Sequence, residues 1–371
     1  MVRSEAVVDL DAIRDNVALL RSRTPAQMMA VVKADGYGHG LVPAARAALT
    51  GGADWLGVAF LEEALALRRD GITAPMLSWL ATPGEDLAAG VAADVDLSAS
   101  APWAVAELAA AARDAGRPAR VHLKIDTGLS RGGAPAADWA DLVTAAAKAA
   151  AAGEVEVIGI WSHFAYADEP GHPTIAHQIE VFGEAVAAAK RLGVDPPLRH
   201  LANSAATLTL PAAHFDLVRP GIAVYGLTPV PPEGYGLTPA MTLRSSVALA
   251  KRVPAGSGVS YGHVYTTEAE TGLALVPLGY ADGVPRNATS VGPLFLAGQR
   301  RTVSGRVCMD QFVVDVGDDA VAAGDEVVLF GPGRGGEPTA QDWADATGTI
   351  SYEIVTRVGA RVPRSYRGRL P

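Results

Sequence analysis

The sequence predicts an α/β protein in which a (β/α)8 TIM-type barrel is followed by a second, mostly β C-terminal domain. Up to about residue 225, short apolar runs alternate with longer amphipathic runs, roughly eight times over. Helical periodicity almost disappears after a proline-rich segment at 230–234, which is typical of a linker. The length of 371 residues also exceeds one ordinary core and favours two domains.

The barrel strands are predicted from short apolar runs bounded by turn residues. These runs are Met28–Val32, Trp55–Ala59, Met76–Trp79, Val95–Leu97, Val121–Ile125, Val157–Trp161, Leu198–Leu201 and Asp216–Val218. Amphipathic helices are expected between them, including Leu61–Arg69, Trp103–Ala115, Trp139–Ala151 and Ile175–Leu192. A doubly wound sheet is the alternative, but it usually needs fewer units, and the glycine fingerprint after its first strand is missing.

The β domain is predicted from short runs that alternate or are rich in β-branched residues. These runs are Leu243–Val253, Leu273–Val276, Phe295–Ala297, Arg301–Val307, Gln311–Val316 and Glu326–Phe330. One helix is expected inside it, because Thr339-Ala340-Gln341-Asp342 resembles a capping box with Asp in place of Glu or Gln. We therefore expect a barrel domain over 1–232 and a β domain over 233–371, with the first few residues able to pack with the β domain.

Composition and charge exclude several classes of function. Hydrophobic residues make up 49% and charged residues 19%, which indicates a folded chain. A formal net charge of -9 argues against a nucleic-acid-binding face. The most apolar run, residues 145–152, carries Lys148, so no membrane span is expected. The single cysteine, Cys308, and an N-terminus without the apolar core of a signal peptide predict a cytoplasmic protein.

A lysine directly follows the first predicted barrel strand, at the end of the barrel where active sites lie. This residue, Lys33, is one of only five lysines, and burial would lower its pKa and make the amine nucleophilic. A lysine that extends its charge into solvent is the alternative on position alone. Glycines at 36, 38 and 40 indicate a loop that approaches another group closely.

Four later runs place polar residues on the same rim, opposite this lysine. They are Lys124–Gly133, Trp161–Ala165, His200–Ser204 and Val218–Gly226. Each run alone is more simply explained by a structural cap or an ion pair, but four such runs on one rim make coincidence a poor explanation. Ser204 before a helical stretch, and Gly221-Ile222 after the last strand, suit a phosphate cradle of backbone N–H groups. With a rim arginine, these features indicate pyridoxal phosphate held as a Schiff base, although lysine aldolase barrels share the first two.

The segment Ala30–Gly40 closely resembles the cofactor-lysine signature of bacterial alanine racemases. The resemblance continues, in the family's order, through Asp126-Thr127-Gly128, Ser162-His163-Phe164-Ala165, Asn203-Ser204, Arg219-Pro220-Gly221-Ile222, Val259-Ser260-Tyr261-Gly262, Leu278–Gly283, Cys308–Gln311 and Ser351-Tyr352-Glu353. It spans nearly the whole chain. One residue departs from the pattern: Ser130 stands where many members carry glycine before Arg131.

The resemblance implies interconversion of L-alanine and D-alanine with pyridoxal 5'-phosphate as the cofactor, and no metal. Lys33 would hold the cofactor as an aldimine and serve as one of two acid/base groups. Tyr261 would be the other, on the opposite face of the substrate. Arg219 would hydrogen-bond the pyridine nitrogen, with His163 behind it. The phosphate would be bound by Tyr37, Ser204, Gly221, Ile222 and Tyr352, with Asn203 beside them.

The resemblance also implies substrate contacts and an assembly. Arg131 would support the substrate carboxylate and the orientation of Tyr261, and the Met309 backbone N–H would reach the same carboxylate. Lys124 matches a lysine that is carbamylated in some members. The family forms homodimers in which the tyrosine base reaches the cofactor of the partner subunit, and its D-alanine supplies peptidoglycan. The substrate corridor of the family matches Asp168, Tyr280, Arg286 and Arg306.

Arg219 favours a racemase over a related decarboxylase. A guanidinium cannot hand a proton to the pyridine nitrogen, whereas decarboxylases of the same two-domain plan place a glutamate there. A non-enzymatic pyridoxal phosphate carrier would resemble the barrel alone, and a lysine aldolase would not explain the motifs over 259–353. A broader racemase that also accepts serine stays open, although such members tend to be exported and no export signal is predicted.

Overall fold

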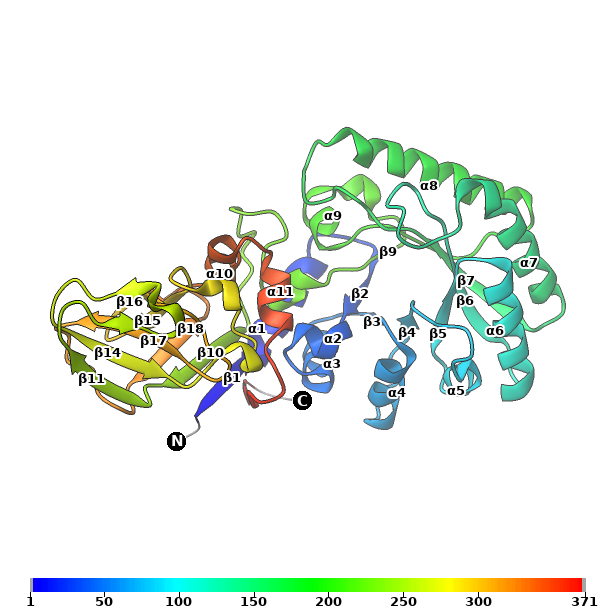
Figure 1. Cartoon of the computed structure of the whole chain (residues 1–371). Helices are drawn as coiled ribbons and strands as arrows, with labels where there is room; N and C mark the ends of the chain where they lie inside the picture. The colour runs from blue at the N-terminus through cyan, green and yellow to red at the C-terminus, as the bar shows by residue number, and fades with distance from the viewer. Residues whose placement is uncertain (1–2, 369–371) are drawn as a thin grey trace.

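The computed structural model describes residues 3–368. A barrel and a mostly β domain lie side by side, with helix α11 (Ser351–Thr356) between them (Figure 1). The extreme residues of the two expected domain ranges, 1–2 and 369–371, lie outside the described part. Within residues 3–368, none of the helices combines the length and apolar character that crossing a membrane requires.

Eight parallel strands form the barrel, which confirms the predicted fold class. Along the chain they are β2 (Gln27–Val31), β3 (Trp55–Val58), β4 (Met76–Ser78), β5 (Asp96–Ala99), β6 (Ala119–Lys124), β7 (Val155–Trp161), β8 (Leu198–His200) and β9 (Leu217–Val218). The sheet order runs from β8 through β7 to β2 and then β9. The Asp216 N–H donates to the Arg199 carbonyl (3.1 Å) and the Arg219 N–H to the Ala202 carbonyl (2.8 Å). These bonds join the two edges, so the barrel is nearly closed.

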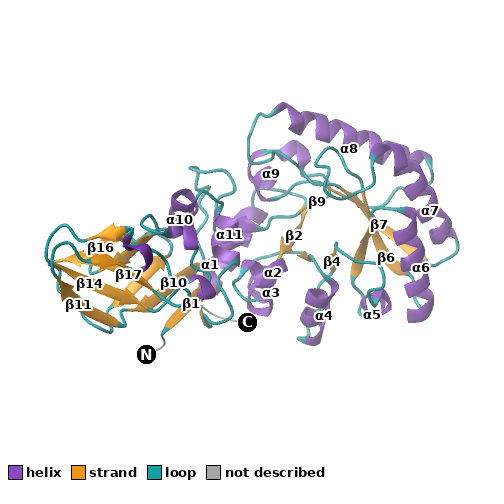
Figure 2. Ribbon diagram, viewed as in Figure 1, coloured by secondary structure: helices purple, strands orange, loops and turns teal. Residues whose placement is uncertain are grey.

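Helices cover the outside of the barrel strands (Figure 2). They are α1 (Leu10–Arg21), α3 (Leu41–Thr50), α4 (Leu61–Arg69), α5 (Leu87–Ala92), α6 (Pro102–Ala115), α7 (Trp139–Ala151), α8 (Pro173–Arg191) and α9 (Ser204–Thr209). The bounds of α4 and α7 match the prediction, and those of α6 and α8 differ by one or two residues. Alanines on the inner faces, such as Ala109 and Ala146, are buried and let the helices lie close to the sheet.

The second domain is mostly β, as predicted. Its sheets have the orders β16-β15-β18-β10-β1-β19, β11-β14-β17 and β12-β13. The strands are β1 (Ser4–Asp9), β10 (Met241–Ser246), β11 (Leu249–Val253), β12 (Gly258–Val259), β13 (Tyr265–Thr266), β14 (Thr271–Val276), β15 (Pro293–Leu296), β16 (Gln299–Thr302), β17 (Phe312–Gly317), β18 (Glu326–Phe330) and β19 (Arg364–Arg367). The predicted capping box begins α10 (Ala340–Thr347): the Asp342 N–H donates to Thr339 Oγ1 (3.1 Å), and the Thr339 N–H to Asp342 Oδ2 (2.8 Å).

Several expectations for this domain were wrong in detail. The run Leu243–Val253 forms two strands, β10 and β11, which belong to different sheets. The expected strand Arg301–Val307 ends at Thr302, and Val303 adds only an isolated bridge to Val314. A second helix, α11, was not predicted, and neither was β1, which pairs with β10 and β19.

The barrel and the β domain meet at the glycine-rich loop after β2. A Cβ on Gly38 would lie 2.4 Å from the Val355 carbonyl oxygen, and one on Gly40 would lie 2.1 Å from the Tyr366 hydroxyl. Arg364 Nε also donates to the Gly38 carbonyl (3.0 Å). These glycines therefore allow the loop after β2 to pack closely against the C-terminal segment of the chain.

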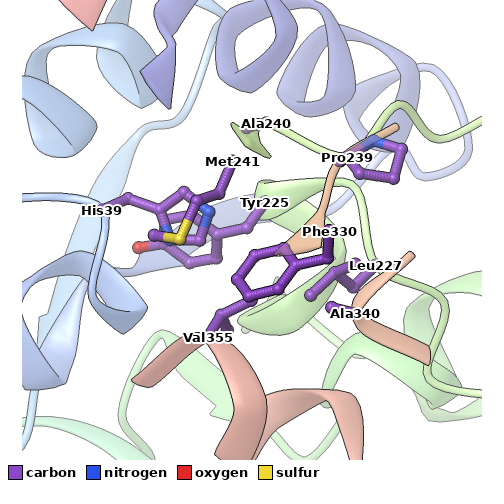
Figure 3. Close-up of a pocket in the computed structure, with 10 residues that line it drawn as sticks. His39, Tyr225, Leu227, Pro239, Ala240, Met241, Phe330, Ala340 and Val355 are labelled. Carbon is purple, nitrogen blue, oxygen red and sulfur yellow. The ribbon is translucent and has the colours of Figure 1, made fainter. Parts of the chain in front are cut away.

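A small cavity lies beside this contact, with His39 and Tyr225 facing Met241 and Phe330 (Figure 3). The cavity is too small to hold a water molecule. His39 Nδ1 donates to the carbonyls of Gly36 (3.1 Å) and Tyr37 (2.9 Å), while its Nε2 has no partner among the described residues. Burial lowers the pKa of His39 to about 4, so the ring is neutral at pH 7.

Candidate active site

A cavity of about 620 Å³ opens at the carboxyl ends of the barrel strands. This volume lies in the range of small-molecule and cofactor sites. Most of the site residues expected from the sequence line it, namely Lys33, Tyr37, Lys124, Arg131, His163, Asn203, Ser204, Arg219, Gly221, Ile222 and Tyr352. The barrel therefore brings together residues that are far apart in the sequence.

Lys33 begins α2 (Lys33–Tyr37), which is a left-handed turn. Ala34, Asp35 and Tyr37 have φ values of 54°, 54° and 53°. Such values cost non-glycine residues on the order of 1–3 kcal/mol each, and they persist where the surroundings hold them. Here Glu63 Oε1 accepts the Ala34 N–H (2.6 Å), and Asp35 Oδ1 accepts the Leu41 N–H (2.8 Å). The turn fixes the backbone of Lys33 at the barrel mouth.

Cations crowd the cavity. Burial lowers the pKa of Lys33, and the nearby Arg131 guanidinium lowers it further. Burial, Arg219 and Arg131 together lower the pKa of Lys124 to about 8. Within residues 3–368, none of these four side chains forms a salt bridge with a carboxylate. This excess of positive charge fits an anionic ligand.

Two tryptophans that the sequence analysis did not single out lie against these cations. Lys33 Nζ is 5.8 Å from the ring centroid of Trp79. Lys124 Nζ and Arg219 Cζ are 4.4 Å and 4.9 Å from that of Trp161. An aromatic face stabilises a cation that has lost its water. Their position at the carboxyl ends of predicted barrel strands is the sequence feature that could have identified them as site residues.

Arg219 follows β9 and is buried. Its guanidinium donates to the Ser162 carbonyl (2.8 Å), to His200 Nδ1 (3.1 Å) and to His163 Nδ1 (3.4 Å). Burial lowers the pKa of Arg219 to about 9, so it stays a cation at pH 7. Burial and the Arg219 charge hold the pKa of His163 well below its usual value, so His163 is a neutral acceptor beside the arginine.

Hydroxyl groups and a glycine gather near Ser204. Ser204 Oγ accepts the N–H groups of Gly221 (2.8 Å) and Ala223 (3.3 Å). A Cβ on Gly221 would lie 2.2 Å from the Tyr37 hydroxyl, so only glycine fits without displacing that phenol. The Tyr37 and Tyr352 rings are 6.4 Å apart. These groups can donate hydrogen bonds to a phosphate.

Two further residues hold the walls of the cavity. Asn203 caps α9, because its Oδ1 accepts the Ala206 N–H (3.1 Å). Asp126 Oδ1 accepts the N–H groups of Gly128 (2.9 Å) and Ser130 (3.2 Å) and so holds the loop that carries Arg131. Ser130 has a φ of 54°, in the left-handed region that favours glycine.

The remaining expected residues lie outside the cavity of the described chain: Asp168, Tyr261, Tyr280, Arg286, Arg306 and Met309. Asp168 lies close to the cavity wall, since its carboxylate adds to the effect of burial in raising the pKa of Tyr352. Tyr261 and Met309 are on the β domain, where their side chains are 72% and 53% exposed. One chain therefore does not bring the expected tyrosine base to Lys33.

The loops around Tyr261 form one cluster on the β domain. Tyr261 begins a short 3-10 helix (Tyr261–His263), and the preceding Ser260 donates to the Arg306 carbonyl (2.8 Å). The Tyr280 N–H donates to the Cys308 carbonyl (3.0 Å), next to Met309. Arg286 begins another 3-10 helix (Arg286–Ala288). Tyr261 is thus held on a fixed but exposed surface.

Fold and site together define a two-domain barrel protein with a cation-rich pocket that contains Lys33. The family models of the alanine racemase N-terminal and C-terminal domains match residues 8–229 and 240–366. The alanine racemase of Salinispora arenicola is 66% identical, with 100% of both chains covered, and that of Frankia casuarinae is 66% identical, with 98% of this chain and 96% of its own covered. The crystal structure of alanine racemase from D-cycloserine-producing Streptomyces lavendulae has a TM-score of 0.99 at 58% identity, covering 100% of this chain and 98% of its own. The chain belongs to the alanine racemase family of enzymes.

Proposed function

We propose that this enzyme interconverts L-alanine and D-alanine with pyridoxal 5'-phosphate. The observation that carries the proposal is the convergence of Lys33, Arg219 and Ser204 on one cation-rich cavity, in a chain that matches alanine racemases over its whole length. A guanidinium beside the cofactor's pyridine nitrogen, rather than a carboxyl group, supports racemisation over decarboxylation.

The cavity residues fit the cofactor. Lys33 would bond its aldehyde carbon, and Arg219 would donate to its pyridine nitrogen. When bound, pyridoxal phosphate withdraws electrons and makes the Cα proton of an attached amino acid removable. The phosphate would be bound by Tyr37, Ser204, Gly221, Ile222 and Tyr352, beside Asn203.

Racemisation requires one group that removes the Cα proton and a second that returns it on the opposite face. Lys33 suits the first role, because burial and Arg131 lower its pKa and favour the neutral amine. Tyr261 is the second group. Arg131 and the Met309 N–H would bind the substrate carboxylate and set the orientation of Cα between the two.

Because Tyr261 does not line the cavity that contains Lys33, we infer a homodimer with shared active sites. The exposure of the Tyr261 cluster supports this inference. The barrel rim supports it too, since Phe60, Leu80 and Trp103 follow three successive strands, β3 to β5, and are all exposed. Exposed apolar groups on one face favour an interface, and a two-fold dimer would build two equivalent sites.

Further residues take their proposed roles from this arrangement. A pKa of about 8 leaves Lys124 partly neutral near pH 7, so it can react with carbon dioxide to give a carbamate beside Arg131. We infer that the substrate enters along Asp168, Tyr280, Arg286 and Arg306.

The single cysteine, Cys308, supports a cytoplasmic location, where D-alanine would supply peptidoglycan synthesis. Rescue of a D-alanine-requiring bacterium by this gene tests that role.

The activity is tested by incubating the protein with each L-amino acid in deuterated water and following Cα exchange together with optical inversion. Alanine should give both, with serine at most a slower substrate. Lys33→Ala should abolish both, whereas the exposed Lys148→Ala should not. Borohydride reduction and peptide mapping should place the pyridoxyl group on Lys33. Decarboxylated product, or label on Lys124 instead, would refute the proposal.

A further inference from the structure

A row of buried polar side chains crosses the barrel interior beneath Arg219. Because side chains alternate along a strand, β6 presents Arg120, His122 and Lys124 on one face, and Lys124 lines the cavity. Asp96 begins β5 and His200 ends β8. Asp96, His122 and His200 are all at most 1% exposed. The reaction described above uses none of these three.

Each member of the row contacts the next. Arg219 Nη1 is 3.1 Å from His200 Nδ1. His200 Nε2 is 2.8 Å from His122 Nδ1. His122 Nε2 is 3.0 Å from Asp96 Oδ2. At the far end, Arg120 Nε donates to Asp96 Oδ1 (2.7 Å), so the carboxylate is paired.

The surrounding barrel holds the two imidazoles in place. A Cβ on Gly159 of β7 would lie 2.6 Å from His122 Nδ1, so a glycine stands where that ring passes. The Trp161 ring is parallel to His200, with 1° between the planes and 5.7 Å between centroids. The Trp55 ring meets His122 edge-on at 5.9 Å. The row is therefore packed on several sides.

The guanidinium fixes the direction of every hydrogen bond in the row. Arg219 has no acceptor, so it must donate, and His200 Nδ1 must be without a proton. Burial and Arg219 hold the pKa of His200 well below its usual value, so the ring is neutral and its proton is on Nε2. His200 then donates to His122 Nδ1, and His122 in turn donates from Nε2 to Asp96.

We propose that Asp96, His122 and His200 form a one-directional relay that positions Arg219 and stabilises its charge at the cofactor's pyridine nitrogen. The inference rests on the proposed function, since it concerns how Arg219 meets the cofactor. Hydrogen bonds aligned in one direction polarise one another, so the buried carboxylate acts on the guanidinium through two rings. The three residues touch neither substrate nor cofactor and are positioning residues.

The proton positions can be measured without an activity assay. In holoenzyme labelled with nitrogen-15 in histidine, long-range proton–nitrogen correlation spectra should show both rings as neutral Nε2–H tautomers at pH 7. Signals that disappear in His122→Gln and His200→Gln assign the two rings. A proton on Nδ1 of either ring, or an imidazolium, would overturn the relay even if every variant failed to fold.

The effect on Arg219 is tested with Asp96→Asn, which keeps an acceptor for His122 but removes the charge. We expect kcat to fall roughly tenfold with KM little changed, because the relay acts at the ring nitrogen and not at the substrate carboxylate. The alkaline loss of kcat should move to lower pH, since a cation without its counter-charge deprotonates more easily. The matched control is Asp216→Asn, which breaks the ion pair with Arg199 (2.6 Å) but contacts no histidine.

The outcomes separate this inference from the function on which it rests. A wild type that does not racemise alanine would refute the proposed function, and with it the role of the relay. A working racemase in which Asp96→Asn and Asp216→Asn behave alike would refute the relay alone. A kcat loss and alkaline shift confined to Asp96→Asn, with the expected tautomers, would support it.

Discussion

At the scale of the residue, the site consists of groups whose usual charge is opposed by burial. The pKa values of Lys33, Lys124 and Arg219 are all lowered, with burial as the largest cause. These cations also repel one another. A bound dianionic phosphate would offset both costs, so binding of the proposed cofactor should stabilise the fold.

Arg219→Glu tests what the cation does at the pyridine nitrogen. Racemisation should fall, and side transamination should rise, because a carboxylic acid can protonate the ring nitrogen and make it a stronger electron sink. Optical inversion and pyruvate formation, measured in the same sample, give the partition between the two reactions. Arg219→Lys keeps a cation and should not raise pyruvate. An unchanged partition in Arg219→Glu would mean that Arg219 does not face the ring.

Most of the expected residues that stand in sequence motifs line the cavity, whereas the buried residues that hydrogen bonds link to Arg219 from other strands were missed. Lys33, Ser204 and Arg219 stand in recognisable runs after strands. His122 carries no such signal, because its partners Asp96 and His200 lie on other strands. Such a contact becomes visible only when the barrel closes.

At the scale of the element, prediction succeeded where burial produced a regular pattern. Barrel strands such as β2 and β3 are almost continuous apolar runs, since both of their faces are covered. β1 was missed because its buried face consists of Ser4, Ala6 and Val8, which hides the alternation. α11 has six residues, too few for a helical period to repeat. The β10–β11 break was missed because Val247 between them is also buried.

The segment after β9 tolerates no side chain at Gly221. Gly221→Ala should displace the Tyr37 hydroxyl and weaken cofactor binding roughly 10- to 100-fold, the size expected of overpacking by one methyl group. Absorbance titration of the stripped enzyme with pyridoxal phosphate measures this. Gly183→Ala is the control, because it adds a methyl group to exposed helix α8 with nothing within 4 Å, and should stabilise by up to about 1 kcal/mol. Equal cofactor affinity in the two variants would contradict the assignment of Gly221.

At the scale of the whole molecule, the active site is expected to need two chains. Mixed and refolded Lys33→Ala and Tyr261→Phe chains should recover about a quarter of wild-type activity. Half of the dimers are mixed under random pairing, and each mixed dimer has one site with both residues intact. If both residues came from one chain, every site would keep a defect. No recovery, with subunit exchange demonstrated by mass spectrometry, would reject the shared site.

The junction between barrel and β domain should be sensitive to acid. His39 binds a proton near pH 6.5 in the unfolded chain but only near pH 4 when folded, so stability is lost as the pH falls through this window. Between pH 7.5 and pH 5 the loss is about 2 kcal/mol. Urea unfolding at both pH values should show a smaller decrease for His39→Gln than for wild type. Equal decreases would show that His39 is not the group responsible, since His163 and His200 are present in both proteins.

The place of β1 in the sheet has a consequence for the order of synthesis. The ribosome makes Ser4–Asp9 before β10, which begins roughly 230 residues later and takes on the order of 10–50 s to reach at cellular elongation rates. Throughout that time the strand has neither of its partners, β10 and β19. Because the buried face of β1 is small and weakly apolar, the unpaired strand is a poor template for aggregation. Nascent chains stalled before Met241 should therefore remain soluble yet be cleaved by protease within residues 4–9, whereas released chains should resist.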